Sequence, residues 1–221
     1  MEHAFWLERW QRNEIGFHQN DINPHLQAFW SRLGVKPGET ILVPLCGKSR
    51  DLLWLAAQGY RVLGVEISAI AVEAFFAENG LRAERARTGS FECWQHDEVS
   101  LLCGDFFALT PALLREVKGV YDRASLIALP PPQREHYAQH LAQLLAPGTR
   151  ILLITMEYPQ QQMQGPPFCV LEEEVRRLYD AAFEVRQIHT ENILDRNPRF
   201  RERGLTELWE RVYRLERHGT A

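Results

Sequence analysis

The sequence has no long apolar run and no leader pattern. No stretch of about 18 apolar residues, the minimum for a helix that crosses a bilayer, occurs in the 221 residues. The amino end, MEHAFWLERW, carries Glu2 and Glu8 in place of the apolar segment of a signal peptide. We therefore expect a cytoplasmic protein that does not associate with a membrane.

Blocks of basic residues are also missing. The 25 Lys and Arg residues are dispersed among 29 Asp and Glu residues, and the formal net charge is −4. A nucleic-acid surface concentrates positive charge on one face or in one stretch of the chain. The charge pattern therefore disfavours a nucleic-acid partner.

Paired cysteines are absent as well. The four cysteines, Cys46, Cys93, Cys103 and Cys169, lie far apart and include no C-x-x-C pair. This usage is typical of reduced thiols in a reducing compartment and not of a disulfide framework.

The glycine-rich loops that hold phosphates are incomplete. Residues Gly47-Lys48-Ser49 repeat the end of a nucleoside-triphosphate loop, but Leu42 occupies the position of its first glycine. The dinucleotide fingerprint G-x-G-x-x-G fails too, because Gly47 stands alone between Pro44 and Gly59. These gaps disfavour nucleoside triphosphates and pyrophosphate-bearing cofactors. A ligand without phosphate would need fewer glycines.

A metal site is not expected. His136 and His140 are four residues apart in HYAQH, but the Glu of an H-E-x-x-H motif and a third ligand are missing. We interpret both histidines as part of a solvated helix surface.

Short apolar or β-branched runs alternate with amphipathic segments, and this alternation predicts an α/β fold. The continuous run TILVPLC (40–46) suits a strand that is buried on both faces of a parallel sheet. Further strands are predicted over 60–68, 99–105, 119–125, 149–158, 183–193 and 205–218. A hairpin-like excursion within 87–106 leads into the strand over 99–105. Helices are predicted over 49–59, 69–80, 110–117, 130–148 and 171–182.

The end of the chain indicates whether the sheet is purely parallel or also contains an antiparallel pair. No helix-length segment separates the last two predicted strands, so they should pair in antiparallel fashion. We therefore predict a doubly wound, seven-stranded, mostly parallel sheet with an antiparallel last strand. The length and the absence of repeats predict a single domain over residues 1–221.

Three polar residues fall at predicted strand ends, where ligands of open α/β sheets gather. Glu66 ends the second strand, where cofactor domains hold an acid against ribose hydroxyls, but it would equally well cap the helix that begins near Ser68. Asp105 ends the third strand and could meet an adenine amino group, or serve as a turn residue or cap. Arg123 ends the fourth strand, a position that favours a ligand over an ion pair with Asp122 or with an acid on a helix.

Six short motifs occur in a specific order along the chain: FWLERW (5–10), GFHQ (16–19), PLCGKS (44–49), GVEIS (64–68), YDRASL (121–126) and GPPF (165–168). In this combination the chain resembles the thiopurine S-methyltransferases, from about Trp6 to about Leu215. These belong to the seven-stranded methyltransferases that depend on S-adenosyl-L-methionine (AdoMet). The resemblance implies AdoMet as cofactor, a Rossmann-like class I methyltransferase fold, and residues 1–30 as an amino-terminal covering segment.

The resemblance also implies the residues of the cofactor site. Trp10 would cover the cofactor, Leu45 would line its methionine side, and Glu66 would hold the ribose. Gly104 and Asp105 would lie beside the adenine. A cationic sulfonium favours an aromatic face, which gives Trp10 a physical reason to serve, although its helical spacing from a second tryptophan also suits packing.

On the acceptor side, the resemblance implies that Arg123 completes the site near the sulfonium and the acceptor. Phe17 matches an aromatic residue of the acceptor pocket, and Arg199 matches a basic residue near the substrate. The region 193–204 departs most from the family pattern, so Arg201 rivals Arg199.

The implied reaction is in-line transfer of the AdoMet methyl group to the thiol or thiolate of a small aromatic or heterocyclic acceptor. Such a transfer needs alignment more than acid–base chemistry, and no Ser-His-Asp or Cys-His set is evident. The segment through Phe17 and the loop 159–168 are candidate lids.

Because a compact chain of this kind looks bacterial, selenium or tellurium compounds are further expected acceptors, with tellurite resistance as a consequence. A methyltransferase with another small acceptor and a nicotinamide-dependent oxidoreductase are the alternatives. We expect a monomer.

Overall fold

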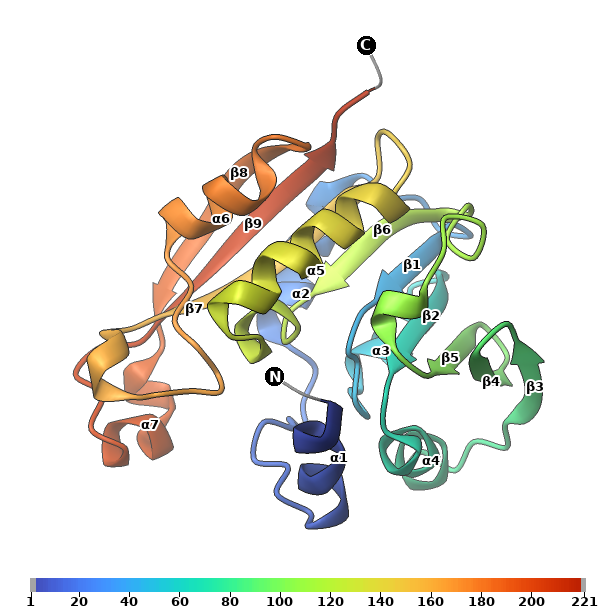
Figure 1. Ribbon diagram of the computed structural model, residues 1–221, viewed down its shortest axis with the longest axis horizontal. Helices are drawn as coiled ribbons and strands as arrows, with labels where there is room; N and C mark the ends of the chain where they lie inside the picture. Colours follow the sequence, from blue (N-terminus) through green and yellow to red (C-terminus); the bar gives the residue numbers. More distant parts are fainter. Residues whose placement is uncertain (1–2, 220–221) are drawn as a thin grey trace. The chain divides into compact units, whose positions relative to one another are not determined.

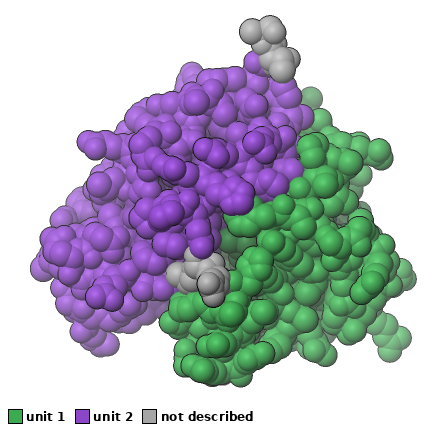
Figure 2. Space-filling view, in the orientation of Figure 1, with its two compact units in different colours: residues 1–121 green, residues 122–221 purple. Residues whose placement is uncertain are grey.

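Figure 1 shows the computed structural model of the protein, in which residues 3–219 are described. Residues 1, 2, 220 and 221 lie outside the described part, although the expected domain includes all four and the expected covering segment includes the first two. The chain divides into two compact units, Met1–Tyr121 and Asp122–Ala221, which Figure 2 colours separately. We refer to them as the first and the second unit. That residues 1–221 form a single domain stays a prediction.

Nine strands form in the described part of the chain. Their bounds are β1 (Thr40–Val43), β2 (Arg61–Glu66), β3 (Glu84–Thr88), β4 (Phe91–His96), β5 (Val99–Cys103), β6 (Val117–Asp122), β7 (Arg150–Glu157), β8 (Phe183–Asn192) and β9 (Trp209–Arg217). The seven expected strands correspond to all of these except β3 and β4, which form the predicted hairpin.

The helices alternate with the strands (Figure 1). Their bounds are α1 (His3–Gln11), α2 (Pro24–Phe29), α3 (Asp51–Ala57), α4 (Ala69–Glu78), α5 (Pro131–Leu144), α6 (Glu172–Tyr179) and α7 (Pro198–Glu202). The ends of α4 illustrate why they form where they do. The Ser68 hydroxyl caps its start by accepting from the amide of Ala71 at 3.3 Å, and Gly80 follows its end with a left-handed φ of 66°.

The strands of the first unit follow the order β3-β4-β5-β2-β1-β6. The pairs β1–β2, β1–β6 and β2–β5 are parallel, while β3–β4 and β4–β5 are antiparallel. The central strands are apolar and fully covered, and Ile41, Leu42 and Val65 have no exposed surface. Glu66 lies beside Cys103 in the register of β2 and β5, so the carboxyl ends of these parallel strands meet at one edge of the sheet.

The strands of the second unit follow the order β7-β9-β8. β9 pairs with β7 from Arg150↔Glu216 to Glu157↔Trp209, and β8 lies on its other side; both pairings are antiparallel. The antiparallel ending that the sequence predicts is therefore confirmed. The fold is α/β with a large, mostly parallel sheet, as expected.

One predicted helix is wrong. Residues 110–117 were expected to be helical, but they form successive turns in which Leu113 N–H donates to Thr110 C=O at 3.0 Å and Leu114 N–H donates to Pro111 C=O at 3.2 Å. β6 begins at Val117, so fewer than two helical turns fit after Pro111. A segment this short does not recover the cost of helix nucleation.

Two sequence expectations concern the chain as a whole. No helix in the part of the chain that the structure describes combines the length and the apolar character that crossing a bilayer requires. All four cysteines are free; Cys46 and Cys169 are buried, and Cys93 and Cys103 are partly covered.

Candidate functional site

Glu66 is a buried carboxylate at the end of β2, with 5% of its surface exposed. Its Oε2 accepts a hydrogen bond from the Gly47 amide at 2.8 Å, and its Oε1 accepts one from the Ser68 amide at 2.8 Å. A carboxylate offers about four acceptor positions, so these two bonds leave room for a hydroxyl donor of a ligand. Burial raises the pKa of the Glu66 carboxyl, while the amides of Ser68, Gly47 and Ile67 act in the opposite direction.

The helix-capping alternative for Glu66 holds only in part. Glu66 does accept from the amide of Ser68, but the side chain that caps α4 is that of Ser68 itself. The arrangement therefore ties β2 to the loop after β1 and leaves acceptor positions free.

The loop after β1 takes an unusual backbone conformation. Leu45 has a φ of 45° and Gly47 a φ of 54°, both in the left-handed region that L side chains rarely adopt. Cys46, between them, donates its amide to the Val65 carbonyl at 3.0 Å and so continues the pairing with β2. Non-glycine residues in this region cluster at functional sites, and Leu45 is such a residue.

Lys48 and Ser49 do not form a phosphate loop. The Nζ of Lys48 donates to both carboxylate oxygens of Glu78 at 2.6 and 2.9 Å, which links the loop to α4. The Ser49 hydroxyl accepts from the Asp51 amide at 3.2 Å and helps to start α3. Ser49 thus helps to open α3, whereas Lys48 pairs with α4.

Trp10 lies directly against the loop after β1. A Cβ added to Gly47 would be 3.2 Å from Cζ2 of the Trp10 indole, so a side chain here would crowd the indole. The indole is 7% exposed and meets the Phe17 ring edge to face, with centroids 5.7 Å apart. Phe17 itself is 38% exposed and also meets Trp6, with centroids 5.5 Å apart. Trp10 therefore packs as a core residue and also covers the strand-end loop.

Gly104 and Asp105 follow β5, next to Glu66. The Gly104 amide donates to the Glu66 carbonyl at 2.9 Å, and a Cβ at position 104 would lie 2.6 Å from the Phe91 ring. The Asp105 side chain accepts from the Phe107 amide at 2.9 Å and so caps the short turn after it. The capping role considered for Asp105 is confirmed, while a ligand role stays a prediction. The first unit thus brings Trp10 and the ends of three strands together.

In the second unit, Arg123 directly follows β6. The ion pair with Asp122 that would have given Arg123 a purely structural role does not form. The Asp122 carboxylate is buried and accepts instead from the Tyr137 hydroxyl at 2.6 Å. Among the residues that the structure describes, none forms an ion pair or a hydrogen bond with the Arg123 side chain, which leaves its guanidinium able to bind an anion.

Arg199 lies in the same positive environment. Partial burial lowers the pKa of Arg199, and the charges of Arg123 and Arg203 lower it further. Its Cζ is 4.8 Å from the centroid of the Phe200 ring. The rival residue, Arg201, is paired with Asp195. The charge of Arg123 acts on Arg199, and the choice between Arg199 and Arg201 stays a prediction.

Sequence reasoning missed a buried carboxylate in the first unit. Asp51 is 2% exposed and accepts from the Asn23 amide and from the Tyr121 hydroxyl, both at 2.9 Å. These partners are 28 and 70 residues away in sequence, and no local pattern signals them. In the described residues, neither His136 nor His140 belongs to a group of three or more potential metal ligands. His136 is exposed as expected, whereas His140 is partly covered and its Nε2 is buried.

The chain is similar to known proteins over nearly its whole length. A family model for thiopurine S-methyltransferase matches residues 1–218. The thiopurine S-methyltransferase of Nitrosospira multiformis is 50% identical over 215 residues, which are 97% of this chain and 98% of that protein. The enzyme of the same name from Pseudomonas entomophila is 52% identical over 217 residues, which are 98% of this chain and 100% of that protein.

Solved structures with low sequence identity share the fold. The Burkholderia thailandensis 1,6-didemethyltoxoflavin-N1-methyltransferase, with bound 1,6-didemethyltoxoflavin and S-adenosylhomocysteine, gives a TM-score of 0.65 at 17% identity over 97% of this chain and 86% of that chain. An AdoMet-dependent methyltransferase of Anabaena variabilis gives 0.65 at 15% identity over 99% of this chain and 96% of that chain. The Rossmann-like methyltransferase fold is thereby confirmed.

Proposed function

The chain belongs to the thiopurine S-methyltransferase family of AdoMet-dependent enzymes, and we propose that it methylates the thiol or thiolate of a small aromatic or heterocyclic acceptor. The observation that carries this proposal is the identity of about half of all residues with enzymes of that name, over nearly the whole chain. The strand-end residues that the reaction needs are present as well.

For the cofactor we propose Trp10, Leu45, Glu66, Gly104 and Asp105, with Arg123 near the methyl group. The free acceptor positions of Glu66 suit the two hydroxyls of an adenosine ribose, and the strained Leu45 lies where the methionine side is expected. The indole of Trp10 supplies an aromatic face for a cation. When bound, AdoMet supplies an electrophilic methyl group on a sulfonium that is an excellent leaving group.

For the acceptor we propose Arg123 and Arg199, with Phe17 as an aromatic contact. The positive charge of Arg123 helps to lower the pKa of Arg199, and an anion bound by both guanidinium groups would relieve their repulsion. They would hold the sulfur in its thiolate form, which is already nucleophilic, so that no general base is required. The residues would then contribute by orienting the sulfur and excluding water.

The proposal extends to selenium and tellurium compounds. Their reduced anions are soft nucleophiles like thiolates, and the same pair of arginines would accept them. Resistance to tellurite would follow in cells that contain the enzyme. Location in the cytoplasm and a monomeric state also belong to this proposal.

A methyl-transfer screen tests the proposed acceptor class. Labelled AdoMet is incubated with thiopurines, thiophenols, selenite and tellurite, and with the phenol that matches each thiophenol as a control. We expect methylation of the sulfur compounds and none of the phenols. Label on the phenols alone, or on none of the sulfur compounds, would contradict the proposal.

A further inference from the structure

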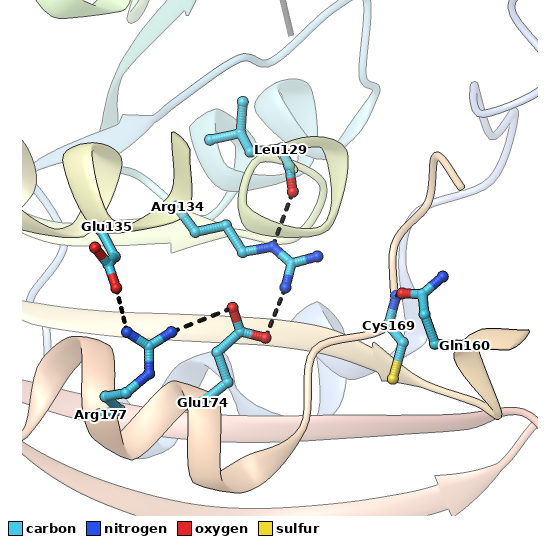
Figure 3. A network of polar contacts seen from close by, with 7 residues as sticks. All are labelled: Leu129, Arg134, Glu135, Gln160, Cys169, Glu174 and Arg177. Carbon is cyan, nitrogen blue, oxygen red and sulfur yellow. Dashed lines mark hydrogen bonds and ion pairs between the residues drawn. The ribbon is translucent and has the colours of Figure 1, made fainter. Parts of the chain in front are cut away.

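The second unit contains a buried ion pair that the proposed chemistry does not use. Arg134 of α5 is 1% exposed, and its Nη1 donates to Oε2 of Glu174 on α6 at 2.6 Å. Its Nε donates to the carbonyl oxygen of Leu129 at 2.8 Å (Figure 3). Leu129 ends the segment that begins with Arg123, which we name the Arg123 loop (residues 123–129). One guanidinium thus joins two helices to this loop.

The same guanidinium also reaches the GPPF segment. Its Cζ lies 5.7 Å from the centroid of the Phe168 ring, which it approaches as a cation. The Phe168 amide donates to the Ile127 carbonyl at 2.7 Å, so the GPPF segment is hydrogen-bonded to the Arg123 loop. On its other side, the Tyr158 hydroxyl donates to the Pro167 carbonyl at 2.6 Å. Arg134 therefore contacts both the Arg123 loop and the GPPF segment, which are also hydrogen-bonded to each other.

The Arg134–Glu174 pair is poorly suited to a role in stability alone. The second amino group of Arg134, Nη2, is buried and has no hydrogen-bond partner within residues 3–219. Desolvating two charges costs free energy that a buried pair recovers only when all of its polar atoms are satisfied. An apolar pair would fill the same space without that cost. What an apolar pair cannot reproduce is the hydrogen bond to the Leu129 carbonyl.

We propose that Arg134 and Glu174 are positioning residues for the acceptor side of the reaction. Glu174 holds the guanidinium in place, and Arg134 sets the Arg123 loop and the GPPF segment, and hence the guanidinium of Arg123. The inference rests on the proposed role of Arg123 in holding the acceptor. It also means that the expected lid 159–168 is anchored at its GPPF end.

A double substitution separates positioning from stability. In Arg134→Met/Glu174→Met the charges are removed together, so the fold should be as stable as that of the wild type in thermal unfolding. The kcat/KM for the thiol acceptor should nevertheless fall about a hundredfold, as expected when a reacting group is displaced by about 1 Å. The Kd for AdoMet, measured by calorimetry, should not change. Arg134→Lys keeps the charge but not the planar donor fork, and should lose acceptor kcat/KM in the same way.

A surface pair outside the network is the matched control. Arg186 and Glu184 pair on β8, and their side chains are 63% and 47% exposed. Arg186→Met/Glu184→Met should have wild-type kinetics. Wild-type acceptor kinetics in the buried double variant would overturn the inference, and so would an equal loss of AdoMet affinity, which would indicate general damage.

Hydrogen exchange tests the inference without an acceptor. Peptides that cover the Arg123 loop and residues 165–170 should exchange faster in Arg134→Lys than in the wild type, and unchanged exchange would overturn the inference. If the wild type methylates no sulfur compound, the proposed function fails, while the exchange experiment still decides the role of Arg134.

Discussion

Replacing Glu66 by Gln tests the central residue of the proposed cofactor site. Both carboxylate oxygens of Glu66 accept from backbone amides, Oε2 from Gly47 and Oε1 from Ser68. Glutamine has one oxygen and one amino group, so one of the two buried amides would face another donor. Leaving a buried donor unsatisfied costs about 1–3 kcal/mol. Removing a charge whose pKa is raised by burial offsets part of this cost, so we expect stability to fall by about 1 kcal/mol.

The effect on the cofactor should be larger. A hydrogen bond to a charged group is worth about 1.5–3 kcal/mol, and each 1.4 kcal/mol is a factor of about ten in Kd. Losing the charged acceptor for the ribose hydroxyls should therefore raise the Kd for AdoMet about ten- to hundredfold.

Calorimetry with matched ligands isolates the ribose contact. The wild type should bind S-adenosylhomocysteine more tightly than its deoxyribose analogue, and Glu66→Gln should discriminate less between the two. Glu73→Gln is the control, because Glu73 is an exposed carboxylate on α4. A folded Glu66→Gln variant with the wild-type Kd for AdoMet would refute the ribose assignment.

Three further outcomes are expected. Arg123→Ala should lower turnover at least tenfold while the melting temperature stays near that of the wild type, since no ion pair is broken; full activity would exclude Arg123 from the reaction. Gly47→Ala should lower the free energy of unfolding by about 1–2 kcal/mol in urea, because alanine is strained at a φ of 54° and its Cβ would meet Trp10. Wild-type stability would contradict the left-handed conformation of residue 47. Burial raises the pKa of Asp122, despite the opposing hydrogen bond from Tyr137. Its contribution to stability is therefore present below the ordinary pKa of an aspartate and is lost as the pH rises through the raised value. Asp122→Asn should thus gain stability relative to the wild type as the pH rises above about 4, the ordinary pKa of an aspartate, and a constant difference in urea titrations would contradict this.

Features that depend on short-range sequence could be predicted. The buried run before Pro44 gave β1, and the placement of Glu66 and Arg123 at strand ends followed from strand lengths alone. The predicted helix over 110–117 shows the limit of this reasoning. Thr110 and Pro111 are good helix starters, but the space left before β6 is set by the sheet and not by local preference.

Features that depend on distant residues could not be predicted. Arg134 and Glu174 are 40 residues apart, and Asp51 and Tyr121 are 70 apart. Each is an ordinary charged or polar residue in its own segment, and only the packing of the elements makes it buried and paired. A single sequence carries no periodic signal for such contacts, because periodicity identifies the face of an element and not its partner.

The two interpretations of Glu66 from sequence were not alternatives at all. A carboxylate can accept about four hydrogen bonds, and the backbone amides of Gly47 and Ser68 use one position on each oxygen. These bonds lock the carboxylate in place before a ligand arrives, which reduces the entropy that binding would cost. The proposed ribose would donate to a remaining acceptor position. The structural role of Glu66 thus prepares its proposed role in binding, and Gly47 serves both by donating its amide and by letting Trp10 approach.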